Sequence, residues 1–363
     1  MRENPQRALI DFAPCASRVD SKLYYALRQN VPVIDAAVTK LVRLLGGFKV
    51  ECSAYQKQCD EILSEIPVGG VSAGLHSFVS QYFEQLLTAG TAVGEIVTDT
   101  AGTPRALFNC PTDPLEFRRN KNGFDVDIFV CRDGLSKPVP HPERFVMSAL
   151  NPLPGAVTGT SLLRTLPFVS GILMKIFETV GENWERAGAL RYAVTYRPGN
   201  DPDDRAFALE RAQQISSAWQ SAMKSGSVRD FVAVGDVEIK VIGADGAILD
   251  PQVPVSLILE QIVAKTGLPP FMLGLNRTST ERMSSQQADL LTSEIEHYRR
   301  ILTPVIEKIA RVFLLSSGIS AKPRAVWEDI TLQDEVELAK ARLYNAQAEK
   351  TEKEINLIER NNG

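Results

Sequence analysis

Residues 267–313 read GLPPFMLGLNRTSTERMSSQQADLLTSEIEHYRRILTPVIEKIARVF. Gly267 is the residue type that most often ends a helix in the left-handed conformation. Pro269 and Pro270 then stiffen a short extended turn, because proline fixes its own φ and restricts the residue before it. A polar loop with two arginines follows, so the stretch predicts a helix, a stiff turn and a loop in that order.

The second half of this stretch predicts a long helix. Thr278 with Glu281, and Ser284 with Gln287, are two possible capping boxes for its start. Pro304 lies within the helix and predicts a kink, because its missing N–H removes one backbone hydrogen bond. One face carries apolar residues at alternating steps of four and three, namely Leu291, Ile295, Tyr298, Leu302, Val305, Ile309 and Val312.

This order of parts resembles the portal proteins of long-tailed bacteriophages. It comprises an apolar helix, the pattern G-x-P-P-x-x-L-G, a Ser/Thr/Asn-rich loop and a long helix with a central L-x-P. In that family the polar loop is the tunnel loop, and the kinked helix carries it. The resemblance implies an α+β, portal-like fold with an α/β wing, a helical stem, a small β-α-β-β clip and a short helical crown. Taken alone, the stretch also fits two packed helices joined by a capped loop.

Length and composition fit a globular protein with two or three lobes. The chain has 363 residues, of which 44% are hydrophobic and 23% charged, and a formal net charge of −4. A protein that wraps duplex DNA is normally basic, because its affinity comes mainly from neutralising phosphates. The charge therefore argues against a DNA-wrapping protein, and any DNA contact should be weak and passing.

The cysteines and apolar runs predict a soluble, cytoplasmic chain, and the resemblance implies assembly in the cytoplasm of a bacterial host. Residues 162–180 form the most apolar run, but Pro167 and Gly171 interrupt it and three charges lie within it, which favours a buried helix over a membrane span. No signal peptide opens the sequence. The cysteines are odd in number and lack a C-x-x-C pair, which predicts free buried thiols: Cys15, Cys52, Cys59, Cys110 and Cys131.

The N-terminal part predicts an α+β lobe. Residues 21–47 have helical spacing interrupted at Pro32, which predicts two helices or one broken helix. A short strand at 48–52 and an amphipathic helix at 75–87 follow. Residues 94–150 alternate between short strand patterns and turns, which predicts an antiparallel meander.

The remaining segments follow the order of a portal subunit. A helix capped at Thr160 or Ser161 should run to residue 189 with a break at Pro167, and its expected apolar side includes Phe177 and Trp184. The resemblance assigns the following parts: 1–158 as N-terminal wing, 159–189 as first stem helix, 190–250 as clip, 251–267 as second stem helix, 268–286 as tunnel-loop region, 287–327 as kinked wing helix with a closing strand, and 328–363 as crown.

Motifs for catalysis are weak. The chain has no phosphate-binding G-x-x-x-x-G-K-[ST] and no metal-ligand spacing among its three histidines. Residues 70–74 match the letters of a nucleophile elbow, but a glycine-rich turn before a helix is the simpler interpretation. Asp125 and Asp127 share one face of a strand, which suits either a metal-dependent nuclease or the wet face of an antiparallel sheet. The sequence predicts no enzyme activity, no cofactor and no metal site.

The resemblance assigns a DNA-channel loop. Its hydroxyl, amide and arginine side chains suit phosphate contacts without base reading. The alternative for the arginines is pairing with Glu281 or with a neighbouring copy. The loop residues are Asn276, Arg277, Thr278, Ser279, Thr280, Arg282, Ser284 and Ser285.

Two further residue sets follow from the resemblance. Glu178, Glu182, Glu185 and Glu260 are candidates for the channel wall, where acidic groups would repel DNA and keep it sliding, or they face other subunits. The apolar stripe on the kinked helix is expected to pack between subunits, through Leu291, Ile295, Tyr298, Leu302, Val305 and Ile309.

The resemblance implies a ring of twelve copies at one vertex of a virion capsid. Double-stranded DNA would pass through it, the wing would contact the major capsid protein, and the clip would meet the terminase and then the head–tail adaptor. No membrane partner is expected. Two other classes remain open: a phage-encoded metal-dependent nuclease, and a scaffold or adaptor that forms no channel.

Overall fold

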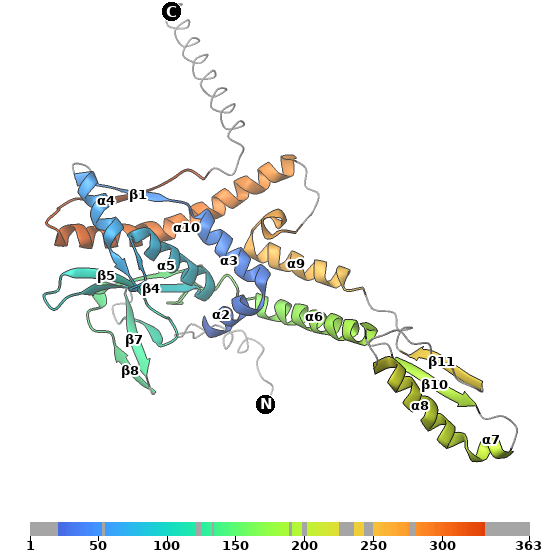
Figure 1. Ribbon diagram of the computed structural model, residues 1–363. Helices are drawn as coiled ribbons and strands as arrows, with labels where there is room; N and C mark the ends of the chain where they lie inside the picture. Colours follow the sequence, from blue (N-terminus) through green and yellow to red (C-terminus); the bar gives the residue numbers. More distant parts are fainter. Residues whose placement is uncertain are drawn as a thin grey trace, which may run out of the picture. The chain divides into compact units, whose positions relative to one another are not determined.

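The protein has a mixed α+β fold made of two compact units. Residues 1–170 with 259–363 form the larger unit and residues 171–258 the smaller one (Figure 1). The boundaries fall within two helices, α6 (Leu166–Gly188) and α9 (Gln252–Thr266). The computed structural model describes residues 21–52, 55–120, 125–132, 134–188, 191–197, 202–224, 236–242, 250–275 and 281–330.

Two helices open the described chain, as the sequence predicts. α2 (Ser21–Asn30) and α3 (Pro32–Leu44) are separated at Val31, which has an extended backbone, and Pro32 starts the second helix. Proline is tolerated there because the first N–H groups of a helix have no partner within it. Arg28 of α2 pairs with Asp35 of α3 at 2.8 Å, which holds this corner together, and with Glu84 of a later helix at 2.7 Å.

The central helix of the larger unit is α5 (Leu75–Ala89), which follows α4 (Gln56–Glu65). Three of the largest fully buried side chains, Tyr82, Phe78 and Phe83, belong to α5. The helix ends at Gly90 with φ at 78°, where a Cβ would lie 2.4 Å from the Ser161 nitrogen. Only glycine meets both the backbone conformation and this close approach.

Strands β2 to β9 form two sheets, so the single antiparallel meander predicted over residues 94–150 is wrong. One sheet has the order β3-β2-β5-β4-β9 and the other the order β6-β7-β8. β4 pairs antiparallel with β9 far along the chain, and β2 pairs parallel with β5. Alternating side chains predict that a segment is a strand, but packing on α5 decides its partner. The strands are β2 (Pro67–Val68), β3 (Ser72–Ala73), β4 (Thr91–Thr98), β5 (Pro104–Asn109), β6 (Leu115–Arg119), β7 (Val126–Arg132), β8 (Leu135–Pro138) and β9 (Phe145–Ala149).

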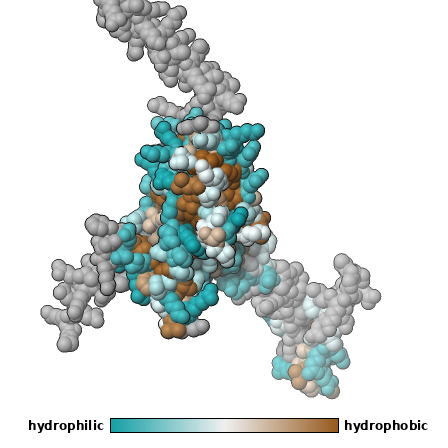
Figure 2. All heavy atoms as spheres, turned by 90° about the vertical axis from the view of Figure 1, so that its left-hand side faces the viewer, coloured by the Kyte–Doolittle hydropathy of each residue, from teal (hydrophilic) through white to brown (hydrophobic). Residues whose placement is uncertain are grey.

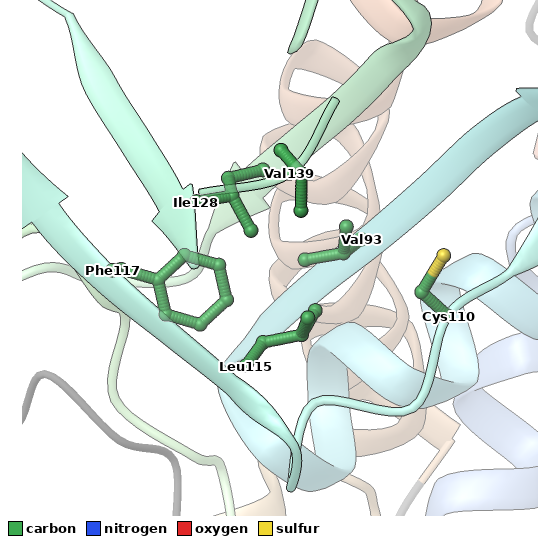
Figure 3. Packing of buried hydrophobic residues seen from close by; sticks show 6 residues of the cluster. All are labelled: Val93, Cys110, Leu115, Phe117, Ile128 and Val139. Carbon is green, nitrogen blue, oxygen red and sulfur yellow. The ribbon is translucent and has the colours of Figure 1, made fainter. Parts of the chain in front are cut away.

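A buried apolar cluster joins the two sheets (Figure 3). Val93 comes from β4, Phe117 from β6 and Ile128 from β7, and a short 3₁₀ helix (Pro142–Arg144) connects β8 to β9. Because the members come from both sheets, the cluster fixes the three-stranded sheet to the body of the larger unit. The cluster consists of Val93, Cys110, Leu115, Phe117, Ile128 and Val139.

The larger unit closes with segments from both halves of the chain. α10 (Glu281–Ser316) contains Pro304 and contacts α4, α5 and β9. β1 (Phe48–Glu51) pairs antiparallel with β12 (Arg324–Trp327), which confirms the predicted closing strand. On the face of the molecule shown in Figure 2, hydrophobic residues form a band with hydrophilic residues on either side.

The smaller unit contains one antiparallel strand pair and a helix. β10 (Arg191–Arg197) pairs with β11 (Asp236–Ile242), and α8 (Ala208–Lys224) contacts β10. α7 (Pro202–Ala206) precedes α8 as a separate short helix. The further strand that the β-α-β-β clip implies, expected at residues 231–234, lies outside the described residues.

α6 also differs from the sequence prediction. It begins at Leu166, so Pro167 lies in its first turn rather than at a break. The expected cap, Ser161, instead holds the turn before the helix, where its Oγ donates to the Thr88 carbonyl at 2.6 Å. Among the described helices, none has the length and apolar character needed to cross a membrane.

Candidate functional site

The predicted DNA-channel loop is only partly described. Residues 276–280, which include Arg277, lie outside the described residues. Arg282, Ser284 and Ser285 belong to the first two turns of α10, because that helix begins at Glu281. The second predicted capping box is therefore inside the helix and not at its start. A short 3₁₀ helix (Pro270–Leu273) ends at Gly274 just before the loop, with φ at 75°.

The apolar stripe of α10 is buried within its own chain. None of its six predicted contact residues is more than 6% exposed. Tyr298 packs on Phe83 of α5 with ring centroids 5.1 Å apart, and burial raises the pKa of Tyr298 to about 12. A side chain that is already buried has no surface left for a neighbour. The prediction of subunit packing through Leu291, Ile295, Tyr298, Leu302, Val305 and Ile309 is therefore corrected: these residues hold α10 to the larger unit.

A buried arginine fixes the middle of α10. Arg299 is 3% exposed and donates from Nε and Nη2 to the Leu45 carbonyl at 3.0 and 2.8 Å. Its Nη1 bonds to Glu296 at 2.9 Å, and its guanidinium lies 5.1 Å from the ring centroid of Trp327. The cation thus caps the end of α3 and stacks on β12. Hydrogen bonds and a charged partner are what a buried cation requires.

Three of the four predicted channel-wall residues share one face of α6. Glu178, Glu182 and Glu185 are all exposed, and their spacing of four and three places them in one row. Glu260 differs from them, since it is half-buried and belongs to α9 in the other compact unit. The structure therefore brings together an acidic row of three.

Sequence reasoning missed a set of exposed apolar side chains on α6 and α9. It expected Phe177 and Trp184 on the buried side of the helix, but they are 55% and 73% exposed. Phe168 is 78% exposed. The sequence did contain a sign of this exposure. The apolar residues of α6 are spread over more of the helix circumference than one neighbouring element can cover. Val253 and Leu257 of α9 are likewise exposed, at 65% and 57%.

The candidate catalytic groups do not form a site among the described residues. Asp127 accepts a hydrogen bond from Asn120 Nδ2 at 2.9 Å, and no group of three potential metal ligands occurs in the described part of the chain. Ser72 lies on the two-residue strand β3, where its Oγ donates to the Val68 carbonyl at 3.3 Å. A nucleophile elbow needs a serine activated by a base, and these bonds are those of a hairpin.

Comparison with solved structures finds the same fold in chains of a gene transfer agent particle. A chain from the virion of the native gene transfer agent (GTA) particle has a TM-score of 0.59 and 16% identity, with 90% of this chain and 88% of that chain covered. A chain from the neck of the native GTA particle, computed with C12 symmetry, gives 0.56 and 16%, with 87% and 85% covered. The chain has the fold of that GTA neck protein.

One more solved structure matches at a lower score. An HK97-family phage portal protein from Corynebacterium diphtheriae shares 14% identity over 83% of this chain and 93% of that chain, with a TM-score of 0.43, and adds nothing to the argument at that score. No protein-family model matches the sequence, and no curated protein matches it. The α+β fold implied by the resemblance is confirmed, while the limits of wing, stem, clip and crown stay predictions.

Proposed function

We propose that this chain is a portal protein, a non-enzymatic subunit that closes into a ring at one vertex of a phage-like capsid. Double-stranded DNA would enter through the ring during packaging and leave through it during ejection. The observation that carries the proposal is the fold shared with a GTA virion protein along 90% of this chain. A related chain lies in a neck computed with C12 symmetry, which supports a ring of twelve copies.

The exposed apolar side chains of α6 support self-association. A large patch of exposed apolar side chains usually marks a site where another molecule binds. Phe177 and Trp184 would pack against the next copy, and head-to-tail contacts of this kind close into a ring when the rotation between copies fits. The subunit contact proposed here thus uses α6 in place of the buried stripe of α10.

The acidic row of α6 suits a channel wall. Glu178, Glu182 and Glu185 would face passing DNA, and negative groups repel phosphates and prevent tight binding. Residues 276–280, together with the first turns of α10 up to Ser285, would contact DNA at the narrowest point. In this proposal the clip, residues 190–250, meets the terminase and the head–tail adaptor, and the wing, residues 1–158, meets the major capsid protein.

Replacing Arg277 and Arg282 with alanine tests the DNA loop. We expect particles that assemble normally but package less DNA, because two phosphate contacts per subunit are lost. The measurement is nuclease-protected DNA per purified particle. Arg311→Ala, an exposed arginine near the other end of α10, is the matched control and should package normally. Normal packaging by the double variant would remove the role proposed for the loop.

The vertex assignment has its own test. Gold-labelled antibody against this chain should mark each particle at a single vertex, beside the tail or neck where one is attached. Labels at many vertices, or on none, would contradict a portal role. If the chain forms a small two-fold oligomer and is absent from the finished particles, the adaptor or scaffold class would be favoured instead.

A further inference from the structure

The larger unit has a pocket of about 670 Å³ beside β1 and α4 (Figure 1). This volume lies within the range of about 300–1,000 Å³ that is typical of small-molecule sites. One wall comes from α4, where Gln56, Asp60 and Ser64 are spaced by four residues and share a face. The other walls come from β1, the start of α5 and the end of β12.

The backbone of β1 is closed toward this pocket. The Val50 carbonyl accepts from Gln56 Nε2 at 2.9 Å and from Cys59 Sγ at 3.7 Å. The Cys52 amide donates to Gln56 Oε1 at 2.9 Å. Phe48 and Val50 are each only 4% exposed. A ligand in this pocket must therefore bind through side chains and not through the strand.

The centre of the pocket is apolar and aromatic. Phe48 stacks on His76 with ring centroids 4.0 Å apart and lies 5.1 Å from the ring of Trp327. His76 is exposed and Trp327 is half-buried, so both rings offer surface to a ligand, and Val50 and Leu63 add aliphatic lining. Such a lining suits the methylene groups of a ligand, because removing them from water is favourable.

Carboxylates line the pocket at both ends of β1. The Glu328 amide donates to the Gly47 carbonyl at 2.9 Å, just before β1 begins. The Glu328 carboxylate lies over Gly47, where an added Cβ would be 2.4 Å from Oε2, so the glycine leaves room for it. Glu51 is the last residue of β1, and a strand rises about 3.3 Å per residue, which puts its backbone about 13 Å from that of Gly47.

A third carboxylate lies on the α4 wall. Asp60 Oδ1 accepts from Gln56 Nε2 at 2.8 Å, and the two hydrogen bonds from Gln56 to the β1 segment hold that amide in place. With Lys49 included and His76 counted as neutral, the charged residues that line the pocket sum to −2. This charge repels phosphate-bearing ligands and attracts cations.

We propose that this pocket binds a linear aliphatic polyamine, a chain of methylene groups with an ammonium group at each end. The terminal ammonium groups pair with Glu328 and Glu51 through charge-assisted hydrogen bonds, and the methylene chain lies over His76 and Trp327. Asp60 takes the inner ammonium of a triamine. A lysine side chain has a single ammonium and satisfies only one end. The bound polyamine joins β12 to β1 and stabilises the folded chain, and this role does not depend on the portal function.

Diamines of different length test the proposal by isothermal titration calorimetry on the full chain. Diaminooctane and diaminopropane, with amines at both ends, carry the same charge, but only the longer one reaches both ends of the pocket. We expect diaminooctane to bind saturably and at least about tenfold more tightly, because a second ion pair and further methylene contacts are added. N-acetyl-lysine methylamide, which has one ammonium, should bind no more tightly than diaminopropane.

Glu328→Gln tests the charge at one end of the pocket. It should weaken diaminooctane binding at least about threefold and reduce the preference for the longer diamine, because one ammonium loses its partner. Asp329→Asn removes the same charge at the next residue, outside the pocket, and is the matched control, with an expected change of less than about 1.5-fold. Circular dichroism verifies that both variants are folded.

Four results would overturn the proposal. They are the absence of saturable diaminooctane binding, equal affinity for the two diamines, equal loss of binding in Glu328→Gln and Asp329→Asn, and binding of the lysine derivative as tight as that of diaminooctane. The last result would assign the pocket to a single basic side chain of a partner protein.

Discussion

The two long helices α10 and α6 carry similar apolar patterns with opposite outcomes. In α10, with 36 residues, the six stripe residues from Leu291 to Ile309 are at most 6% exposed. In α6, with 23 residues, Phe168, Phe177 and Trp184 are 78%, 55% and 73% exposed. Helical spacing therefore shows which residues are apolar on a helix face, but not whether the same chain or another copy covers them.

The buried stripe of α10 contributes to the stability of the single chain, whereas the exposed apolar side chains of α6 can contribute only to assembly. Fully burying a leucine or isoleucine side chain contributes about 1.5–3 kcal/mol. For α10 this gain belongs to the folding of one chain, because Leu302 and Ile309 are both 0% exposed. For α6 a comparable gain becomes available only on association. The predictions below test this separation from the largest expected change in chain stability to the smallest.

Leu302→Asp should have the largest effect. A charge placed at a position with 0% exposure has no partner, so we expect a loss of about 5 kcal/mol or more in the free energy of unfolding. Urea unfolding followed by circular dichroism measures it. Leu290→Asp, on the same helix but 70% exposed, is the control and should change stability by less than about 0.5 kcal/mol. A folded Leu302→Asp chain that merely fails to associate would restore the subunit-packing role of the stripe.

Arg299→Met should have an intermediate effect. Methionine fills similar space but leaves the Leu45 carbonyl without its two guanidinium hydrogen bonds, so we expect a loss of about 2 kcal/mol. The same unfolding experiment measures it. Arg300→Met, at an exposed neighbouring position, is the matched control. Unchanged stability in Arg299→Met would mean that Arg299 does not hold α3 to α10.

Trp184→Asp should leave the single chain nearly unchanged. Its side chain is 73% exposed, so we expect a stability change within about 0.5 kcal/mol together with a loss of self-association. Light scattering of the purified chain measures the mass of the assemblies. Lys175→Asp is the control, because it introduces an aspartate at another exposed position of α6. This variant should self-associate more than Trp184→Asp does. If Trp184→Asp assembles like the unaltered chain, the contact surface lies elsewhere.

The outer face of the β6-β7-β8 sheet differs from both helices, because its polar side chains form hydrogen bonds with one another. Glu116 accepts from Arg118 Nε at 2.8 Å, and from Cys131 Sγ and Ser136 Oγ, each at 3.2 Å. The arginine first, and then the thiol and the hydroxyl, lower the pKa of Glu116 to about 2.

A pH titration of stability tests this network and should show the smallest effect. Because the folded-state pKa of Glu116 lies below its unfolded value, the stabilisation is full above the unfolded pKa and is lost as pH falls toward 2. Glu116→Gln should therefore be less stable than the unaltered chain at pH 6, and the difference should shrink below pH 4. A constant difference between pH 6 and pH 2 would contradict the assigned interaction.

Much of the fold could be predicted from the sequence because local signals decide it. The break before Pro32 and the helix at residues 75–87 follow from proline chemistry and apolar spacing, while the closing strand near Trp327 was implied by the resemblance to portal proteins. The pairing of β4 with β9 could not be predicted, because it depends on packing across the whole larger unit. The start of α6 was misplaced because Pro167 was interpreted as an interruption, although proline is well tolerated in a first turn.

The candidate site was less predictable than the fold. Glu178, Glu182 and Glu185 were predicted as a set because the resemblance assigns residues 159–189 to a stem helix, on which they are acidic residues. The exposure of Trp184 was missed, because an apolar residue on an amphipathic helix has the same pattern whether its cover is internal or external.

The most direct test of the central claim is electron microscopy of the purified full chain, with its mass measured in solution. The account predicts closed rings with a central hole and a mass close to twelve chains of 39.9 kDa. It also predicts that Trp184→Asp yields folded chains without rings. A compact oligomer with a single two-fold axis and no central hole would contradict the ring that this account proposes.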